Sequence, residues 1–242
     1  MKRKFLSGST AFVVCLLVLV MSTGCTADRQ GPVEPTTTIQ PAITPGEDSY
    51  TTVLDAGTLD ARLDEYPAGT LSAAEMSDLG YLQEEEKLAR DVYGVFYATW
   101  GMQVFRNIGN AEQTHMDSVT VLIDRYGLAS SENNPAGVFE HPELQDLYDN
   151  LVESGLQSPE DAIRAAALVE ETDIVDLRDA LGRTDNADIR YVYENLMRGS
   201  ENHLRAFVRN LEGQGESYAP VVLSQDDYAA ILSTPVRPGG FS

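Results

Sequence analysis

Four segments of the chain repeat apolar residues at alternating steps of three and four positions, the period of a helix with one buried face. Midway along each, a residue that can bind a metal interrupts the apolar stripe. The four stripes are Leu79, Leu82, Glu86, Ala89, Tyr93, Phe96 and Trp100; Phe105, Ile108, Glu112, His115, Val119, Leu122 and Tyr126; Ile163, Ala167, Glu170, Ile174, Leu177 and Leu181; and Ile189, Tyr193, Leu196, Ser200, His203 and Phe207. The pattern predicts four helices around one core.

Local signals mark where these helices begin and end. The first starts at Ser72, which can form a capping box with Glu75, and stops near Gly101. The other three run from Gln103 to Gly127, from the Ser158 cap to Gly182, and from just after Asp185 to about Gly213. Two of the connections are so short that the helices they join must be antiparallel.

About thirty residues separate the second and third helices, and they include a short predicted helix over residues 143–152. Such a link is long enough to run the length of a bundle. Two hairpins joined by one long crossover predict an all-α four-helix bundle with ferritin-like connectivity rather than a simple up-down-up-down order. Another short helix is predicted around residues 225–232.

The first 25 residues have the features of a targeting segment. Three basic residues at positions 2–4 precede an apolar run over residues 11–21, which is short for a transmembrane helix. The segment resembles a lipoprotein signal peptide, which implies that Cys25 is lipidated and anchors an exported protein to the extracytoplasmic side of a membrane. Because Ser22 stands where such signals usually carry an aliphatic residue, ordinary secretory cleavage is the alternative. The only other cysteine, Cys15, lies inside the apolar run, so no disulfide is expected.

The rest of the chain divides by composition. Residues 26–70 carry five prolines among threonines, glycines and acids, which predicts a disordered tether. Residues 71–234 have the length of one domain and hold the four-helix bundle. Residues 235–242, with two prolines and two glycines, are expected to form a flexible tail.

The chain is strongly acidic, with 17 Lys and Arg against 38 Asp and Glu and a net charge of −21. Without residues 1–25, which hold three cations and no anions, the balance is 14 against 38, or −24. Such a surface repels nucleic acid and anionic lipid, so neither is an expected partner. It favours cations, although an acidic surface also simply keeps an exported protein soluble.

The polar residues on the stripes predict a metal site. Glu112 and His115 lie one turn apart on one helix face, and Glu86 interrupts the neighbouring stripe at a similar depth. The other hairpin offers Glu170 and His203 in the same way. Three carboxylates in one core, with no Lys or Arg on any stripe, are strongly destabilising unless a cation neutralises them.

A structural alternative remains open at this point. Glu86 and Glu170 could point outward beside Glu85 and Glu171, while the two histidines are hydrogen-bonded core residues.

Residues 86–93, Glu-Lys-Leu-Ala-Arg-Asp-Val-Tyr, resemble the first iron-binding helix of rubrerythrin-type proteins. More closely, four runs resemble the family called domain of unknown function 2202; they are residues 84–93, 111–115, 169–177 and 198–207. That family is ferritin-like, and the resemblance covers about residues 71–212. It implies a ferritin-like fold and a metal site, but no particular reaction.

The sequence departs from the ferritin pattern in the last helix. A full di-iron site takes a glutamate from each of two helices and Glu-x-x-His from each of the other two, whereas this helix offers Ser200-x-x-His203. Asp173, or Glu201 if the helix is overwound near Gly199, could supply the missing carboxylate; otherwise one metal is expected.

Two tyrosines and the choice of metal complete the prediction. Tyr93 and Tyr193 are either core aromatics or hydrogen-bond donors to ligand carboxylates. Mixed carboxylate and imidazole ligation suits one or two iron or manganese ions, and the same ligands accept zinc.

The sequence favours an extracytoplasmic, lipid-anchored metal-binding protein that oxidises Fe(II) or reduces peroxide. No glycine-rich phosphate loop follows a strand, and neither core histidine has an evident serine or cysteine nucleophile, so other enzyme classes are not indicated. The alternative is a non-catalytic helical module that docks a partner protein at the cell surface. No catalytic residue is assigned.

Overall fold

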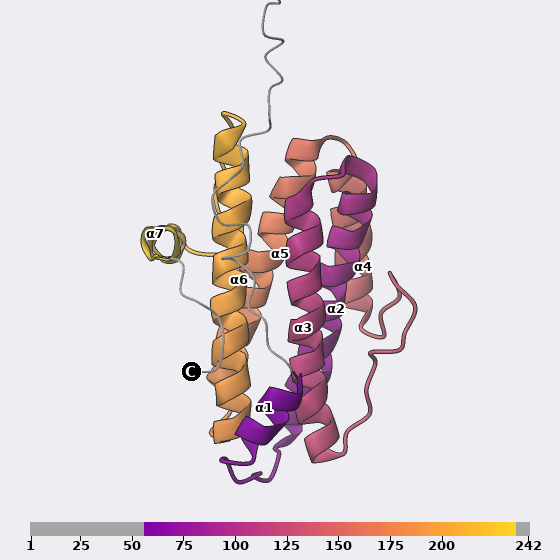
Figure 1. Cartoon of the computed structure of the whole chain (residues 1–242), viewed down its shortest axis with the longest axis vertical. Helices are drawn as coiled ribbons and strands as arrows, with labels where there is room; N and C mark the ends of the chain where they lie inside the picture. Colours follow the sequence, from indigo (N-terminus) through magenta and orange to yellow (C-terminus); the bar gives the residue numbers. More distant parts are fainter. Residues whose placement is uncertain (1–55, 236–242) are drawn as a thin grey trace, which may run out of the picture. The chain divides into compact units, whose positions relative to one another are not determined.

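A computed structural model describes residues 56–235, and within that range the chain forms seven helices and no strand (Figure 1). The helices are α1 Ala56–Leu63, α2 Ala73–Trp100, α3 Gln103–Tyr126, α4 Pro142–Gly155, α5 Pro159–Leu181, α6 Ala187–Gly213 and α7 Gln225–Ser233. None of these described helices is both long and apolar enough to cross a membrane. The predicted signal peptide with Cys25, the tether up to residue 55 and residues 236–242 lie outside the described residues.

The four long helices pack side by side as a bundle (Figure 1). α2 lies against α3 and α5 against α6, and the two hairpins meet through contacts of α2 with α5 and of α3 with α6. The linker between the hairpins contains α4, which packs against α2 and α5. An all-α bundle made of two hairpins joined by a long crossover therefore agrees with the sequence prediction.

The predicted helix boundaries are confirmed by their caps. Ser72 Oγ accepts a hydrogen bond from the Glu75 amide at 3.2 Å, and the Ser72 amide donates one to the Glu75 carboxylate at 2.7 Å, which completes the capping box. Ser158 caps α5 in the same way through the Asp161 amide. α2 ends at Gly101, whose φ of 67° is in the left-handed region that favours glycine.

The predicted disordered tether was wrong for residues 56–70. Leu59 and Leu63 of α1 are fully buried, and α1 packs against α3. The segment after α1 is held too, because Arg125 donates to the carbonyl oxygen of Tyr66 at 2.6 Å. The prediction relied on the proline-rich composition of the segment and overlooked that its two leucines are four residues apart. That spacing places both side chains on one face of a short helix.

Charged residues on the outer face of α2 hold the crossover in place. Glu84 accepts hydrogen bonds from the amides of Glu140 and His141 at 2.8 and 3.0 Å. The buried Lys87 pairs with Asp91 at 2.8 Å and also donates to two loop carbonyl oxygens. These bonds replace the water that the charged groups lose on burial.

The core consists of two apolar clusters stacked along the bundle. The first includes Tyr93, Phe96, Phe105 and Phe207, and the second includes Leu79 and its neighbours near the opposite end. On α2, α3 and α6 the metal-binding residues of the stripe fall between the parts that contribute to the two clusters, whereas on α5 Glu170 lies between Val169 and Ile174 of the first cluster. The bundle therefore contains one buried polar layer with a water-excluding apolar layer on either side.

Candidate metal centre

Every predicted ligand side chain points into this polar layer. At most 2 % of the surface of each is exposed. The five are Glu86 of α2, Glu112 and His115 of α3, Glu170 of α5, and His203 of α6. Each sits mid-helix on the same face as large apolar residues, so packing of the apolar stripes carries the polar residues into the core.

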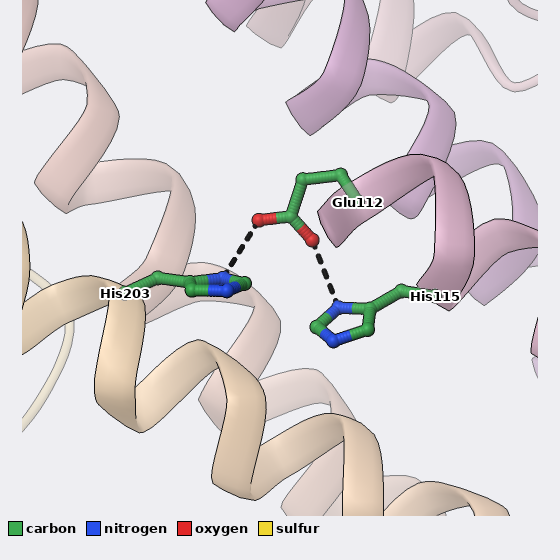
Figure 2. Close-up of side chains that lie close together, drawn as sticks. All are labelled: Glu112, His115 and His203. Atoms are coloured by element: carbon green, nitrogen blue, oxygen red, sulfur yellow. Dashed lines mark ion pairs between the residues drawn. The ribbon is translucent and has the colours of Figure 1, made fainter. Parts of the chain in front are cut away.

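Glu112 lies between the two histidines, as Figure 2 shows. Its Oε2 is 2.9 Å from His115 Nδ1, and its Oε1 is 2.8 Å from His203 Nδ1. The two imidazole rings are nearly parallel, with centroids 5.3 Å apart and planes inclined by 24°. One ligand atom from each of these three residues lies within 4.8 Å of the others, so the three side chains are close enough together to hold metal.

Glu86 and Glu170 flank this trio on opposite sides. Glu86 Oε2 is 3.3 Å from His115 Nδ1, and Glu170 Oε2 is 3.5 Å from His203 Nδ1. Each imidazole therefore faces one oxygen of the central Glu112 and one oxygen of an outer glutamate. The arrangement has two similar halves that share Glu112.

The short distances do not amount to satisfied hydrogen bonds. Both ring nitrogens of His115 and of His203 lack a hydrogen-bond partner among the described residues, and so do Glu86 Oε1 and Glu112 Oε1. A buried polar atom without a partner costs free energy, and such atoms are rare in folded proteins. Their gathering at one place indicates a bound group that is absent from the protein chain itself.

The pKa values of these side chains reflect burial and mutual charge. Burial raises the pKa of Glu86 to about 7 and that of Glu170 to about 8. Burial would also raise the pKa of Glu112, but the charges of His203 and His115 outweigh it and hold that pKa well below its ordinary value. Burial would lower the pKa of His203, yet Glu112 and Glu170 raise it to about 10. In the metal-free protein, protons take the place of a neutralising cation.

Two further residues contact the ligands or complete the layer. Tyr93 donates its hydroxyl proton to Glu170 Oε1 at 2.6 Å. Ser200 donates to Asp173 Oδ2, which leaves the other oxygen of this buried aspartate without a partner. Asp173 lies one turn after Glu170 on α5, so it brings a fourth carboxylate to the layer. The facing helix α6 has a serine, not an acid, at the corresponding position.

Two of the residues considered from the sequence lie elsewhere. Glu201 pairs with Arg205 at 3.3 Å on α6, and about a quarter of its side chain is exposed. Tyr193 belongs to the second apolar cluster, and its hydroxyl has no hydrogen-bond partner among the described residues. Tyr193 is therefore a core aromatic, the first of the two roles considered from the sequence.

The structural alternative also fails in its details. Glu86 and Glu170 point inward, and their neighbours Glu85 and Glu171 are buried as well. Glu171 accepts hydrogen bonds from the segment after α6, and Glu85 shares a hydrogen bond with Asp176 of α5. Glu85 lies off the apolar stripe, so the helical period did not single it out.

The residues present fit a transition metal. Imidazole nitrogens together with carboxylate oxygens form a mixed ligand set that iron, manganese and zinc all accept. The hydrogen bond from Tyr93 to Glu170 is of the kind that orients a ligating carboxylate.

Comparison with known proteins places the chain in a single group. Residues 75–235 match a family model described as "Uncharacterized protein domain (DUF2202)". The chain is 45% identical over 174 residues to "Uncharacterized protein MJ0754" of Methanocaldococcus jannaschii, which covers 72% of this chain and 94% of the relative. A crystal structure described as hypothetical protein MJ0754 from Methanococcus jannaschii matches with a TM-score of 0.69, over 71% of this chain and 98% of that one.

Proposed function

The chain belongs to the DUF2202 family, and we propose that its core is a ferritin-like four-helix bundle built around a transition-metal site. The ligands are Glu86, Glu112, His115, Glu170 and His203, with Asp173 as a further ligand. The observation that carries the proposal is the group of buried nitrogen and oxygen atoms without hydrogen-bond partners, gathered around Glu112.

Charge favours two metal positions. Glu86, Glu112, Glu170 and Asp173 together carry four negative charges when ionised, which two divalent cations would neutralise. The two halves of the centre share Glu112, so each position receives one histidine, one oxygen of Glu112 and one outer glutamate. Iron and manganese suit this set best, and zinc is the competing ion.

The chemistry we propose is oxidation of Fe(II) by oxygen or peroxide, in which the oxidant is reduced by electrons from the iron. A bound iron or manganese ion supplies the redox chemistry that the side chains lack. The protein fixes the ligands on four rigid helices and excludes water with an apolar cluster on either side. The hydroxyl oxygen of Tyr93 lies 2.6 Å from Glu170 Oε1 and donates its hydrogen to that carboxylate.

Metal content and stability test the proposal. Purified protein should contain iron or manganese by elemental analysis, and a chelator should lower its melting temperature because the ion binds only the folded chain. Glu112→Gln, and the double variant Glu112→Ala, His115→Ala, should abolish both effects. Glu201→Gln is the matched control, because that glutamate pairs with Arg205 instead. A wild-type protein without metal and insensitive to chelator would favour the non-catalytic docking module.

Reactivity is tested separately. Protein loaded anaerobically with Fe(II) should change its visible spectrum on addition of peroxide faster than free iron does, and the Glu112→Gln variant should lose this advantage. Loaded protein that reacts no faster than iron in buffer would leave a metal-binding protein without turnover.

We also propose that Cys25 is lipidated and holds the protein at the extracytoplasmic face of a membrane. The support is the sequence pattern of residues 1–25 alone. Mass spectrometry should find a lipid-modified cysteine at the mature N-terminus, and Cys25→Ser should release the protein from the membrane fraction. An unmodified N-terminus, or a variant still in the membrane fraction, contradicts the anchor.

A further inference from the structure

A hollow of about 190 Å³ lies between α2 and α3, on the outer side of the bundle from the proposed metal centre. Its lining includes two arginines, two tyrosines and two glycines, which are Arg90, Tyr93, Gly94 and Tyr97 of α2 and Arg106 and Gly109 of α3. Tyr93 is fully buried and forms part of the floor, whereas Gly94 and Arg106 are exposed. The hollow is therefore open to solvent, and a small molecule can enter it while the bundle stays folded.

Glycines on the two facing helices leave this space open. Arg90 of α2 bonds Gln113 of the antiparallel α3 at 2.7 Å, and Gly94 and Gly109 each lie one turn from that pair, so the two glycines face each other. A Cβ at Gly94 would meet no atom within 4 Å, and one at Gly109 would come no nearer than 3.5 Å to another residue. Packing alone therefore admits alanine at both positions, which would stabilise the helices. What the glycines provide instead is room for a molecule.

The charge around the hollow favours an anion. Arg90 shares the carboxylate of Asp91 with the buried Lys87, at 2.8 Å in each pair, so two cations lie beside one anion and a positive charge remains. Arg106 has no hydrogen-bond or ion-pair partner among the described residues, and its guanidinium is therefore available to a ligand. No Asp or Glu lines the hollow, although the whole chain has a net charge of −21. A cationic hollow in so acidic a protein is a selective place for a negatively charged molecule.

The size and the walls of the hollow suit one flat aromatic ring. Tyr97 lines it beside Tyr93, and Phe105 lines it from α3. The rings of Tyr93 and Phe105 lie 6.5 Å apart between centroids, with their planes inclined by 29°. In another protein a cavity of about 150 Å³ holds a benzene molecule, so the present volume has room for a ring that carries a carboxylate. Aromatic walls bind the ring, and a guanidinium binds the carboxylate with two parallel hydrogen bonds.

We propose that this hollow is a binding site for a small aromatic carboxylate. The carboxylate pairs with Arg106, and the ring lies over the two glycines against Tyr97. The site stands on its own residues, so it does not depend on whether the centre holds metal. Its position nevertheless relates it to that centre, because Tyr93 lines the hollow and donates its hydroxyl hydrogen to Glu170 at 2.6 Å. A single side chain therefore connects the bound molecule with a proposed metal ligand.

Ligand-observed NMR on the metal-free, full-length protein tests the site, with para-hydroxybenzoate as the probe. We expect saturable binding with a Kd on the order of 1 mM or tighter, as for other ligands of about ten heavy atoms. The uncharged para-hydroxybenzamide and inorganic phosphate should each bind about tenfold more weakly, because one lacks the charge and the other the ring. Arg106→Gln should weaken binding of the probe about tenfold. Arg178→Gln is the matched control, since it removes an equal charge from another exposed arginine, on α5.

A second pair of variants tests the space itself. Gly94→Leu should fill the hollow and abolish binding, whereas Gly80→Leu adds the same side chain to α2 at a glycine that also has no neighbour within 4 Å but lies outside the hollow. Absence of saturable binding in wild type overturns the site, and so does wild-type affinity in Arg106→Gln. Equal weakening by Arg178→Gln, or phosphate binding as tight as that of the probe, would reduce the effect to general attraction of anions. If Gly94→Leu does not fold, Arg106→Gln decides the matter, because its exposed side chain has no partner to lose.

Discussion

Ser200 on α6 donates its hydroxyl hydrogen bond to Asp173 on α5, so a serine three residues before His203 holds the carboxylate of the facing helix. Ser200 is fully buried, and its hydroxyl oxygen lies 3.1 Å from the carbonyl oxygen of Leu196, a second acceptor for the same hydrogen. Asp173 has no other hydrogen-bond partner among the described residues. α6 lacks the glutamate that a ferritin-type helix carries three residues before its histidine. Asp173 of α5 supplies a carboxylate in its place, and Ser200 of α6 orients that carboxylate.

Replacing this serine should weaken the centre. In Ser200→Ala, Asp173 loses its donor, so the unfolding free energy of the metal-free protein should fall by about 1–3 kcal/mol. Metal affinity should fall about 10–100-fold, the usual effect of removing a group that orients a ligand. Denaturation and metal titration measure the two effects. Ser118→Ala is the matched control, because among the residues that the structure describes this buried serine bonds the carbonyl oxygen of Thr114 and no ligand of the centre. Equal losses of affinity in both variants would contradict the role of Ser200.

We expect opposite effects on metal affinity from removing the hydroxyl groups of the two buried tyrosines. Tyr93→Phe removes the hydrogen bond to Glu170, so metal affinity should drop about tenfold or more. Tyr193→Phe removes a buried hydroxyl that has no partner, so it should leave metal affinity unchanged and stability equal or higher. Calorimetric titration and thermal melting of the pair check this. A loss of affinity in Tyr193→Phe, or none in Tyr93→Phe, would show that hydrogen bonding to Glu170 does not tune the site.

The apolar stripes made the bundle and its ligands predictable. A residue such as Glu112 that sits between Ile108 and Val119 on a helix face must enter the core when that face is buried, so period alone locates it. The caps at Ser72 and Ser158 could also be predicted from the sequence, because they depend on hydrogen bonds between residues three positions apart.

Residues whose environment is made by tertiary packing were not predictable in this way. Glu84 and Lys87 are buried because the crossover lies on them, and the hydrophobic period of α2 does not predict that contact. Glu85 is buried by α5, a neighbour that the period of α2 cannot reveal. α1 was missed because Leu59 and Leu63 are two apolar residues in a proline-rich segment, too few to establish a helical period.

Glu171 should fix the segment that follows α6. It is fully buried, and it accepts hydrogen bonds from the amides of Val222 and Leu223 at 2.8 and 2.7 Å. The amide of Val221 and the hydroxyl of Tyr218 donate to the same carboxylate. Glu171→Gln weakens several charge-assisted bonds at once, so unfolding free energy should fall by about 2–4 kcal/mol.

Hydrogen exchange gives the more direct reading of the Glu171→Gln variant. Amides 221–223 should exchange much faster than in wild type, while the amides of the α2–α3 hairpin change less. The control is Glu216→Gln, which breaks an exposed pair with Arg164 and should cost about 0–1 kcal/mol. Unchanged protection of residues 221–223 would contradict the role of Glu171.

The stability of the metal-free protein should fall as pH rises. The pKa of Glu86 is about 7 and that of Glu170 about 8 in the folded chain, against 4.5 ordinarily, so between pH 4.5 and 8 the folded state binds protons that the unfolded state has released. Raised folded pKa values mean that stability is present at low pH and is lost through this window. His203 extends the loss, since its pKa rises from 6.5 to about 10.

Metal should reverse this dependence, because cations take the place of the protons and bind better as the ligands deprotonate. We therefore expect the unfolding free energy of chelator-treated protein to decline from pH 5 to 9, and that of metal-loaded protein to stay level or rise. The double variant Glu86→Gln, Glu170→Gln should remove the part of the decline that these two glutamates contribute between pH 4.5 and 8 and leave the contribution of His203 from pH 6.5 upward. Denaturation series at fixed ionic strength measure all three profiles. A metal-free wild type whose stability is constant across this range would show that the buried carboxylates do not hold protons in the absence of metal.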